Sequence, residues 1–307
     1  MFPLASSIGW FVGARFVDRI GKGIRGAPRD ALVADIAPDH LRGASFGLRQ
    51  SLDTIGAFVG PLFAIGLMLL TADNFKLVFW IAVIPAFIAF ALMIYGVEEP
   101  AKKAASETSK PRLQWRDAKL FSGAFWVVVG IAAIFTLARF SEAFLILKAQ
   151  NVGLPIAFVP VVMVVMNIIY ALSSYPAGSL SDRIGRNGIL LVGIAMLIVA
   201  DLTLAFAVTI PAVLLGVVFW GLHMGLTQGL LATLVADTAP ERLRGTAFGI
   251  FNLASGVAML IASVIAGGLW DAYGPRFTFL AGAAFTAIAL IGLVITQRHR
   301  QRRTSLQ

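Results

Sequence analysis

One long apolar stretch, residues 9–36, carries charged side chains along a single face. At 100° per residue, these side chains fall within about 140° of the circumference of a helix. A basic residue at the centre of a membrane costs about 3 kcal/mol, so the face should line a wet cavity, pair with acids or attract an anion. Three of them, Arg25, Arg29 and Asp30, lie near one end and could instead reach the membrane surface. The face comprises Arg15, Asp18, Arg19, Lys22, Arg25, Arg29 and Asp30.

A second charged pair, Arg139 and Glu142, interrupts the apolar stretch 119–147. On a continuous helix, residues three apart share a face. A membrane carboxylate beside an arginine is a candidate proton site, because its affinity for a proton depends on whether the arginine is engaged elsewhere. The alternative is a permanent structural ion pair.

Three uncharged polar side chains lie in the middle of other apolar stretches: Asn167, His223 and Gln228. Each is a candidate contact for a substrate or a proton, or else an interhelical hydrogen bond. No second histidine or carboxylate lies at metal-ligand spacing from His223, so no metal site is expected. The sequence has no GxSxG, HExxH or phosphate-loop motif, which argues against an enzyme, a cofactor and ATP as the energy source.

The composition is that of an integral membrane protein. Of the 307 residues, 58% are apolar and 13% are charged, whereas soluble domains carry about 25% charge. A membrane core needs about 20 helical residues to cross. Nine stretches qualify, which predicts an all-α bundle of nine transmembrane helices. They are residues 9–36, 44–70, 77–97, 119–147, 154–179, 187–208, 211–236, 246–270 and 276–297.

The sequence also contains an internal repeat. Residues 33–48 and 235–250 match at ten of sixteen positions with a constant offset of 202, which predicts two structural repeats with the same polar elbow between two helices. Residues 119–200 have no counterpart upstream, so about three helices of the first repeat are expected to be missing in front. The predicted units are a partial bundle at 1–97, a linker at 98–118, a six-helix bundle at 119–297 and a basic tail at 298–307.

The positions of lysine and arginine orient these helices. Both elbows, the linker and the tail are rich in basic residues, whereas the opposite side holds only Lys76, Lys148 and Arg276. By the positive-inside rule, the linker and the C-terminus are expected in the cytoplasm, with the protein in the inner (plasma) membrane. The net charge of +9 therefore reflects membrane orientation, and nucleic acid is not an expected partner.

The segment that joins the fifth and sixth stretches reads Gly178-x-x-x-Asp182-Arg183-x-Gly185-Arg186. It resembles the loop signature of the major facilitator superfamily, although Asn187 replaces the last basic residue. The elbows with Arg42 and Arg244 are similar to the loops after helices four and ten of that family. The start of its antiporter motif, Gly56-x-x-x-Gly60-Pro61, is also present, without the downstream glycines.

The resemblance implies helices four to twelve of a twelve-helix transporter with two bundles and alternating access. The expected oligomeric state, which the resemblance does not specify, is a monomer. The resemblance also implies a gating role for Gly178, Asp182, Arg183, Gly185, Arg186, Arg42 and Arg244. In this scheme Asp182 pairs with Arg244, and Arg42 is left without its partner.

The function expected from these features is secondary active transport of a small organic solute. The cationic face favours an anionic or amphipathic solute, and protons are the expected coupling ion. Two alternatives stay open at this point. One is a proton-coupled multidrug exporter, which the partial antiporter motif favours, and the other is a membrane binding or sensing protein that does not transport.

Overall fold

The computed structural model describes residues 7–72, 74–96 and 120–304, and every regular element in these ranges is helical. The predicted linker 98–118 lies outside the described residues. Within these ranges ten α-helices follow one another, with short 3₁₀ turns at Asp39–Leu41, Ile156–Phe158 and Glu241–Leu243. The helices are α1 (Ile8–Ile36), α2 (Arg42–Leu70), α3 (Phe75–Gly96), α4 (Gly123–Ala138), α5 (Ala143–Asn151), α6 (Val159–Ile184), α7 (Arg186–Phe206), α8 (Ile210–Thr238), α9 (Arg244–Tyr273) and α10 (Pro275–Thr304).

The structure confirms the all-α membrane fold. Within the described ranges, seven segments are long and apolar enough to cross a membrane, and α4 with α5 counts as one of them. Helix α1 is not among the seven, although it has 29 residues, because its charges lower the hydropathy. Helix α10 carries the apolar stretch expected at residues 276–297.

The predicted continuous span 119–147 is wrong in one respect, because the helix breaks in the middle of the membrane segment. Helix α4 ends at Ala138, and α5 begins at Ala143. Arg139 has extended backbone angles, φ −107° and ψ 101°, and its N–H donates to the carbonyls of Phe135 and Thr136. Arg139 and Glu142 therefore do not share a helix face.

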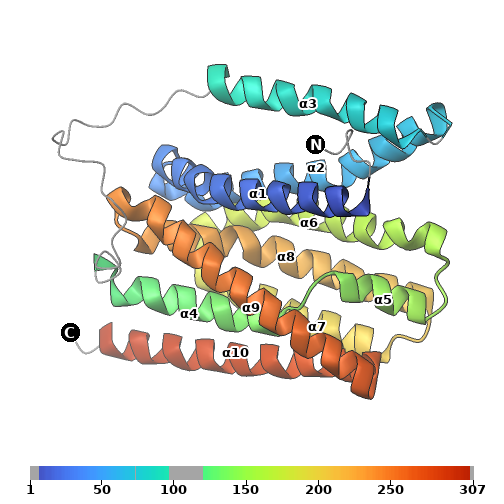
Figure 1. The fold of residues 1–307 in the computed structure, drawn as a ribbon. Helices are drawn as coiled ribbons and strands as arrows, with labels where there is room; N and C mark the ends of the chain where they lie inside the picture. Colours follow the sequence, from blue (N-terminus) through green and yellow to red (C-terminus); the bar gives the residue numbers. More distant parts are fainter. Residues whose placement is uncertain (1–6, 73, 97–119, 305–307) are drawn as a thin grey trace.

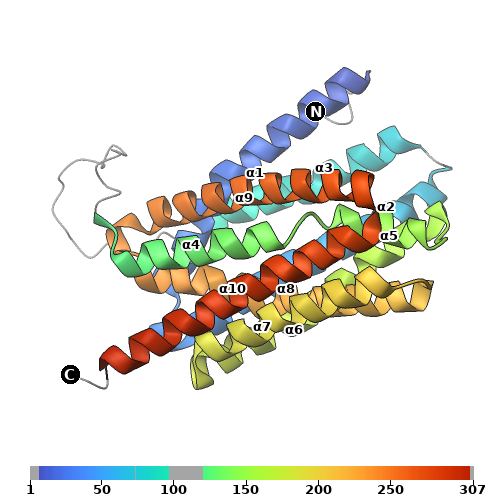
Figure 2. The same cartoon turned by 90° about the horizontal axis from the view of Figure 1, so that it is seen from below.

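The helices lie side by side along one direction (Figure 1). Helix α2 packs along α6, and α8 packs against both α6 and α7, while α10 packs on α7. The main apolar core lies among α4 to α10, around Trp220, Phe140 and Phe279. Seen from below, α1 diverges from α9 toward the N-terminus (Figure 2).

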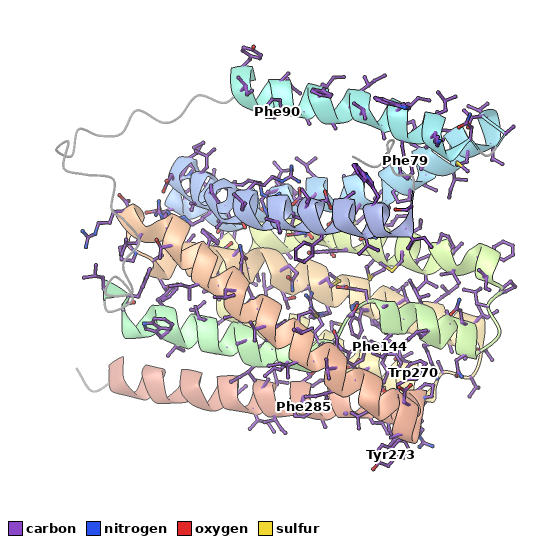
Figure 3. All side chains as sticks on the ribbon, in the orientation of Figure 1. Phe79, Phe90, Phe144, Trp270, Tyr273 and Phe285 are labelled. Atoms are coloured by element: carbon purple, nitrogen blue, oxygen red, sulfur yellow. The ribbon has the colours of Figure 1, made fainter. Side chains whose placement is uncertain are left out.

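Helix α3 lies apart from this core. In Figure 1 it forms the outermost layer, beyond α2, and it packs against α2. Its side chains, including the labelled Phe79 and Phe90, are apolar around most of the helix (Figure 3). Trp80, Phe87 and Phe90 are exposed, as expected of a helix that is covered by lipid rather than by protein.

The two repeated elbows adopt the same local structure. In the first, the N–H of Ala37 caps α1 by donating to the carbonyl of Val33, and the N–H of Leu41 donates to Pro38. In the second, the N–H groups of Ala239 and Leu243 donate to Val235 and Pro240 in the same pattern. Each proline has φ near −60° and starts a 3₁₀ turn, because its ring fixes that angle. The repeat in the sequence is thus a repeat in structure at this point.

Candidate functional site

The two elbows hold each other through reciprocal ion pairs. Arg42 Nη1 of the first elbow lies 2.8 Å from Asp237 Oδ1 at the end of α8. Arg244 Nη1 of the second elbow lies 2.6 Å from Asp35 Oδ1 at the end of α1. These four residues are two pairs of repeat equivalents, because both the arginines and the aspartates are offset by 202 positions. Each repeat therefore supplies one cation and one anion to the other.

Further contacts reinforce this cluster. Arg42 Nη2 reaches Asp39 Oδ1 at 2.5 Å, and Arg244 Nη1 also donates to the carbonyl of Ala34 at 3.2 Å. Arg186, at the start of α7, contacts Asp237 as well. Both Arg42 and Arg244 are buried, and ionic hydrogen bonds that are shielded from water are stronger than exposed ones.

Asp182 joins the cluster through the N-terminus of α2 rather than through Arg244. Its Oδ1 accepts a hydrogen bond from the N–H of Gly43 at 2.9 Å, and its Oδ2 accepts one from Ala44 at 2.8 Å. The first N–H groups of a helix have no partner within the helix and carry a partial positive charge, so they bind a carboxylate well. The expectation that Asp182 pairs with Arg244 is wrong, and so is the expectation that Arg42 lacks a partner.

The other residues of the loop signature have distinct positions. Gly178 touches the backbone of Gly43 where α6 crosses α2, and a Cβ at either glycine would collide with the other helix. Gly185 has φ +92° between α6 and α7, a conformation that favours glycine. Arg186 Nη2 lies 3.8 Å from Asp182 Oδ1, whereas Arg183 is exposed.

A second charged cluster joins α1 to α2. Arg29 Nη1 lies 2.9 Å from Asp53 Oδ2, and Arg49 Nη1 lies 2.9 Å from Asp30 Oδ1. Arg49 and Asp53 were not predicted from the sequence as partners of α1. A signal was present, since two opposite charges four residues apart within an apolar stretch indicate an intramembrane partner for another helix.

The part of α1 that carries the deeper charges is largely uncovered by the rest of the described chain. The side chains of Asp18, Lys22 and Arg25 are exposed, and those of Arg15 and Arg19 lie outside the described set. Helix α1 packs mainly on α9. Apolar residues of the same turns, such as Phe16, Ile20 and Ile24, are exposed as well, so the exposure belongs to this part of α1 as a whole.

The remaining pathway candidates lie among the C-terminal helices. Arg139 is buried at the end of α4, and its Nη1 has no hydrogen-bond partner among the described residues. Glu142 is partly buried and forms no ion pair with Arg139 within the described ranges, so the alternative of a permanent pair is not what this structure contains. His223 is buried, with Nδ1 3.1 Å from the carbonyl of Gly193.

Asn167 donates to the carbonyl of Met163 on its own helix at 2.8 Å, and Gln228 is partly buried on α8. The structure therefore brings Arg42, Arg244, Asp182 and Arg186, which the resemblance implicates in gating, together at one end of the bundle. It leaves the pathway candidates distributed over α1, the α4–α5 break, α6 and α8.

These features define a class: a polytopic helical bundle built from two repeats, with a charged network that connects the repeats at one end. Comparison with known proteins agrees. The family model of the Major Facilitator Superfamily matches residues 1–254 and 143–307. An MFS-type transporter of Methanocaldococcus jannaschii is 32% identical over 281 residues, which cover 89% of this chain and 68% of the relative.

Solved structures show the same fold. The human organic anion transporter TETRAN superposes with a TM-score of 0.75 at 16% identity, covering 95% of this chain and 72% of that one. The proton:xylose symporter XylE gives a TM-score of 0.65 at 14% identity, covering 85% and 65%. The chain thus spans about two thirds of the length of these proteins. It belongs to the Major Facilitator Superfamily, a family of membrane transporters rather than enzymes.

Proposed function

We propose that this protein is a secondary active transporter of a small organic anion or amphipathic solute, and that the elbow end is its cytoplasmic gate. The observation that carries the proposal is the reciprocal pairing of Arg42 with Asp237 and of Arg244 with Asp35. In a two-bundle transporter one repeat rocks against the other. Contacts that bridge the repeats at one end must break for that end to open.

The gate in its closed form has a clear physical basis. Two buried arginines bind acids of the opposite repeat, and Asp182 binds the N-terminus of α2. Opening leaves these groups to water, so the loss of ionic hydrogen bonds is offset by hydration. The closed and open gates are therefore close in free energy. A substrate can shift the equilibrium between them only by its differential affinity for the two states, so a small difference is required.

The solute class follows from charge. Helix α1 presents Lys22 and Arg25 on an exposed face that also carries Arg15 in the sequence. Among its deeper residues, the one acid, Asp18, cannot neutralise both Arg15 and Lys22. An anionic group on the solute compensates the excess positive charge in a low-dielectric cavity. The structural neighbour described as an organic anion transporter supports this reading.

Protons are the proposed coupling ion, with Glu142 as the first candidate carrier. It lies at the α4–α5 break beside Arg139, whose guanidinium is incompletely bonded. Discontinuous helices commonly form ion sites in secondary transporters. A structural neighbour is described as a proton symporter, which is consistent with this assignment.

The test is flux in proteoliposomes that contain the full-length protein. A panel of radiolabelled organic carboxylates is offered with and without an imposed pH gradient, and efflux of cationic dyes is measured in parallel. Saturable, pH-driven carboxylate flux is expected. Dye efflux without carboxylate flux would favour the multidrug exporter that Gly56-x-x-x-Gly60-Pro61 suggests, and no flux of either kind would favour a binding or sensing protein.

A further inference from the structure

Asp201 is a carboxyl group sealed in the apolar core of the C-terminal helices. It lies on α7, its side chain is completely buried, and neither carboxyl oxygen has a hydrogen-bond partner among the described residues. Its neighbours one turn away on the same helix, Leu197 and Leu204, are also completely buried. Buried polar groups in folded proteins nearly always have partners, so an exception calls for a functional explanation.

Helix α10 and the α4–α5 break pack against this carboxyl group. On α10, a Cβ at Gly282 would lie 2.7 Å from Asp201 Oδ2, so the absence of a side chain there leaves room for the carboxyl. The same added Cβ at Gly282 would lie 3.0 Å from Cε1 of Phe140. Phe140 belongs to the α4–α5 break, which brings the ring into the core instead of continuing the helix.

Charged and titratable groups surround Asp201 only at a distance. On α8, His223 faces α7 at Gly193, eight residues before Asp201. On α10, Arg276 lies over the Phe206 ring at 4.7 Å. On α6, Asp182 and Arg183 lie at the opposite end of α7, and Arg139 and Glu142 flank Phe140 in the break. In the described ranges none of them forms an ion pair or a hydrogen bond with Asp201.

We propose that Asp201 is a proton-binding site of this transporter, and that displacement of Phe140 exposes it to water during the transport cycle. An ionised carboxylate without a counter-charge is very costly in such surroundings, whereas the protonated form is neutral. The exchange step is simple: the O–H bond of the carboxyl breaks, the proton passes to a water molecule, and hydronium is formed. The reverse step reloads the site.

The α4–α5 break is the segment whose movement would displace Phe140. Phe140 is in ring contact with Phe144, Trp220 and Phe279, at centroid distances of 5.2, 5.5 and 5.4 Å. Phe144 in turn meets Trp270 of α9 (Figure 3). The indole N–H of Trp220 also lacks a partner in the described part of the chain. Residues 139–142 are not held by continuous helical hydrogen bonds, so a shift there can admit water to both unpartnered groups.

This inference rests on proton-coupled transport as the proposed function and names a site for the proton in addition to Glu142. The first measurement does not depend on transport. The full-length protein in lipid nanodiscs is studied by infrared difference spectroscopy, where a protonated carboxyl gives a carbonyl band that shifts in D₂O. At neutral pH, Asp201→Asn should remove this band, and Glu142→Gln should retain it.

A second variant, Gly282→Ala, tests the proposal if Asp201→Asn does not fold. Gly282→Ala adds a methyl group 2.7 Å from Oδ2 and should shift the band. Gly267→Ala on α9, where nothing lies within 4 Å of an added Cβ, is the matched control and should leave it unchanged. If the band survives in Asp201→Asn, another carboxyl produces it. If the band is unaffected by Gly282→Ala, it does not come from a carboxyl beside Gly282. Either outcome overturns the proposal.

The second measurement tests coupling. With a solute that the wild-type protein transports, Asp201→Asn should reduce pH-driven accumulation about tenfold, in the usual range for coupling between sites, and should leave solute exchange nearly unchanged. If the band is lost but pH-driven accumulation is preserved, Asp201 is a fixed neutral carboxyl and its proposed role is overturned. If the wild-type protein moves no solute, the proposed function fails, while the infrared result still decides whether Asp201 binds a proton.

Discussion

At the scale of single residues, Asp182 has the most specific contacts of the proposed gate. It receives two backbone N–H groups of α2, from Gly43 and Ala44, across an interval of almost 140 residues. Hydrogen bonds to a charged group contribute about 1.5–3 kcal/mol each. An amide at this position keeps the shape of the side chain but loses the negative charge that complements the helix N-terminus.

We therefore expect Asp182→Asn to insert and fold but to slow turnover, because the closed gate is weakened. The chain has no cysteine, so a single Thr54→Cys on the buried face of α2 reports on opening through its labelling rate. Labelling should be faster in Asp182→Asn. Arg183→Ala is the control from the same motif, because Arg183 is exposed. Equal labelling and turnover in both variants would exclude Asp182 from the gate.

The cationic face of α1 gives a second prediction at this scale. Lys22→Ala and Arg15→Ala should weaken solute binding about tenfold, the equivalent of ~1.4 kcal/mol, with little loss of thermal stability. The reason is that Lys22 is exposed and contributes charge rather than packing. Solute affinity and melting temperature in detergent are measured together, with Lys76→Ala as control. A loss of stability at unchanged affinity would show that these residues are structural and would remove the argument for an anionic solute.

At the scale of elements, the crossing of α2 and α6 depends on glycine. Gly43, Gly47 and Gly178 allow the two backbones to touch, and Ser51 Oγ donates to the carbonyl of Ala171 at 2.6 Å further along the same interface. The repeat equivalent of Gly43 is Gly245, which has nothing within 4 Å of an added Cβ. The same sequence position is thus crowded in one repeat and open in the other.

This asymmetry predicts that Gly43→Ala destabilises the protein by about 1–3 kcal/mol, as expected for overpacking, whereas Gly245→Ala is neutral. The physical reason is that a methyl at position 43 must displace Ser181 and Asp182, both of which are held by hydrogen bonds. Thermal unfolding of the two variants in the same detergent makes the comparison. Equal melting temperatures would mean that the crossing is looser than described.

At the scale of the whole molecule, the two charged clusters have different roles. Arg42–Asp237 and Arg244–Asp35 connect the repeats, whereas Arg29–Asp53 and Arg49–Asp30 connect α1 and α2 within one repeat. Only the pairs that connect the two repeats must break when one bundle rocks against the other. The within-repeat pairs are expected to persist through the cycle.

A pair of double-mutant cycles tests this distinction. Arg42→Ala with Asp237→Ala should show a coupling energy of about 0.5–3 kcal/mol in the equilibrium between the closed and open gate, measured by the labelling of Thr54→Cys. Arg29→Ala with Asp53→Ala should show coupling in thermal stability but none in gate opening. Coupling of both pairs to opening would contradict the assignment of the gate to the elbows.

Much of the architecture could be predicted from the sequence, for local reasons. Apolar length predicts helices, because every backbone group in a membrane must be paired within the chain. The proline of each elbow fixes a φ angle, and the constant offset of 202 predicts that Pro38 and Pro240 start the same turn. The loop signature Gly178-x-x-x-Asp182-Arg183-x-Gly185-Arg186, together with the repeat, the polar linker and the charge asymmetry, was sufficient to indicate the family.

Only the tertiary structure decided which partners meet. The sequence marks Arg42, Arg244 and Asp182 as candidates, but their partners lie about 140 to 210 positions away, and helix periodicity has no information over that distance. The break at residues 139–142 was missed because its apolar flanks read as one helix. Asp201 was missed because its isolation is a property of the surrounding helices: a single acid in an apolar stretch becomes exceptional only when Gly282 and Phe140 close around it and leave its oxygens without partners.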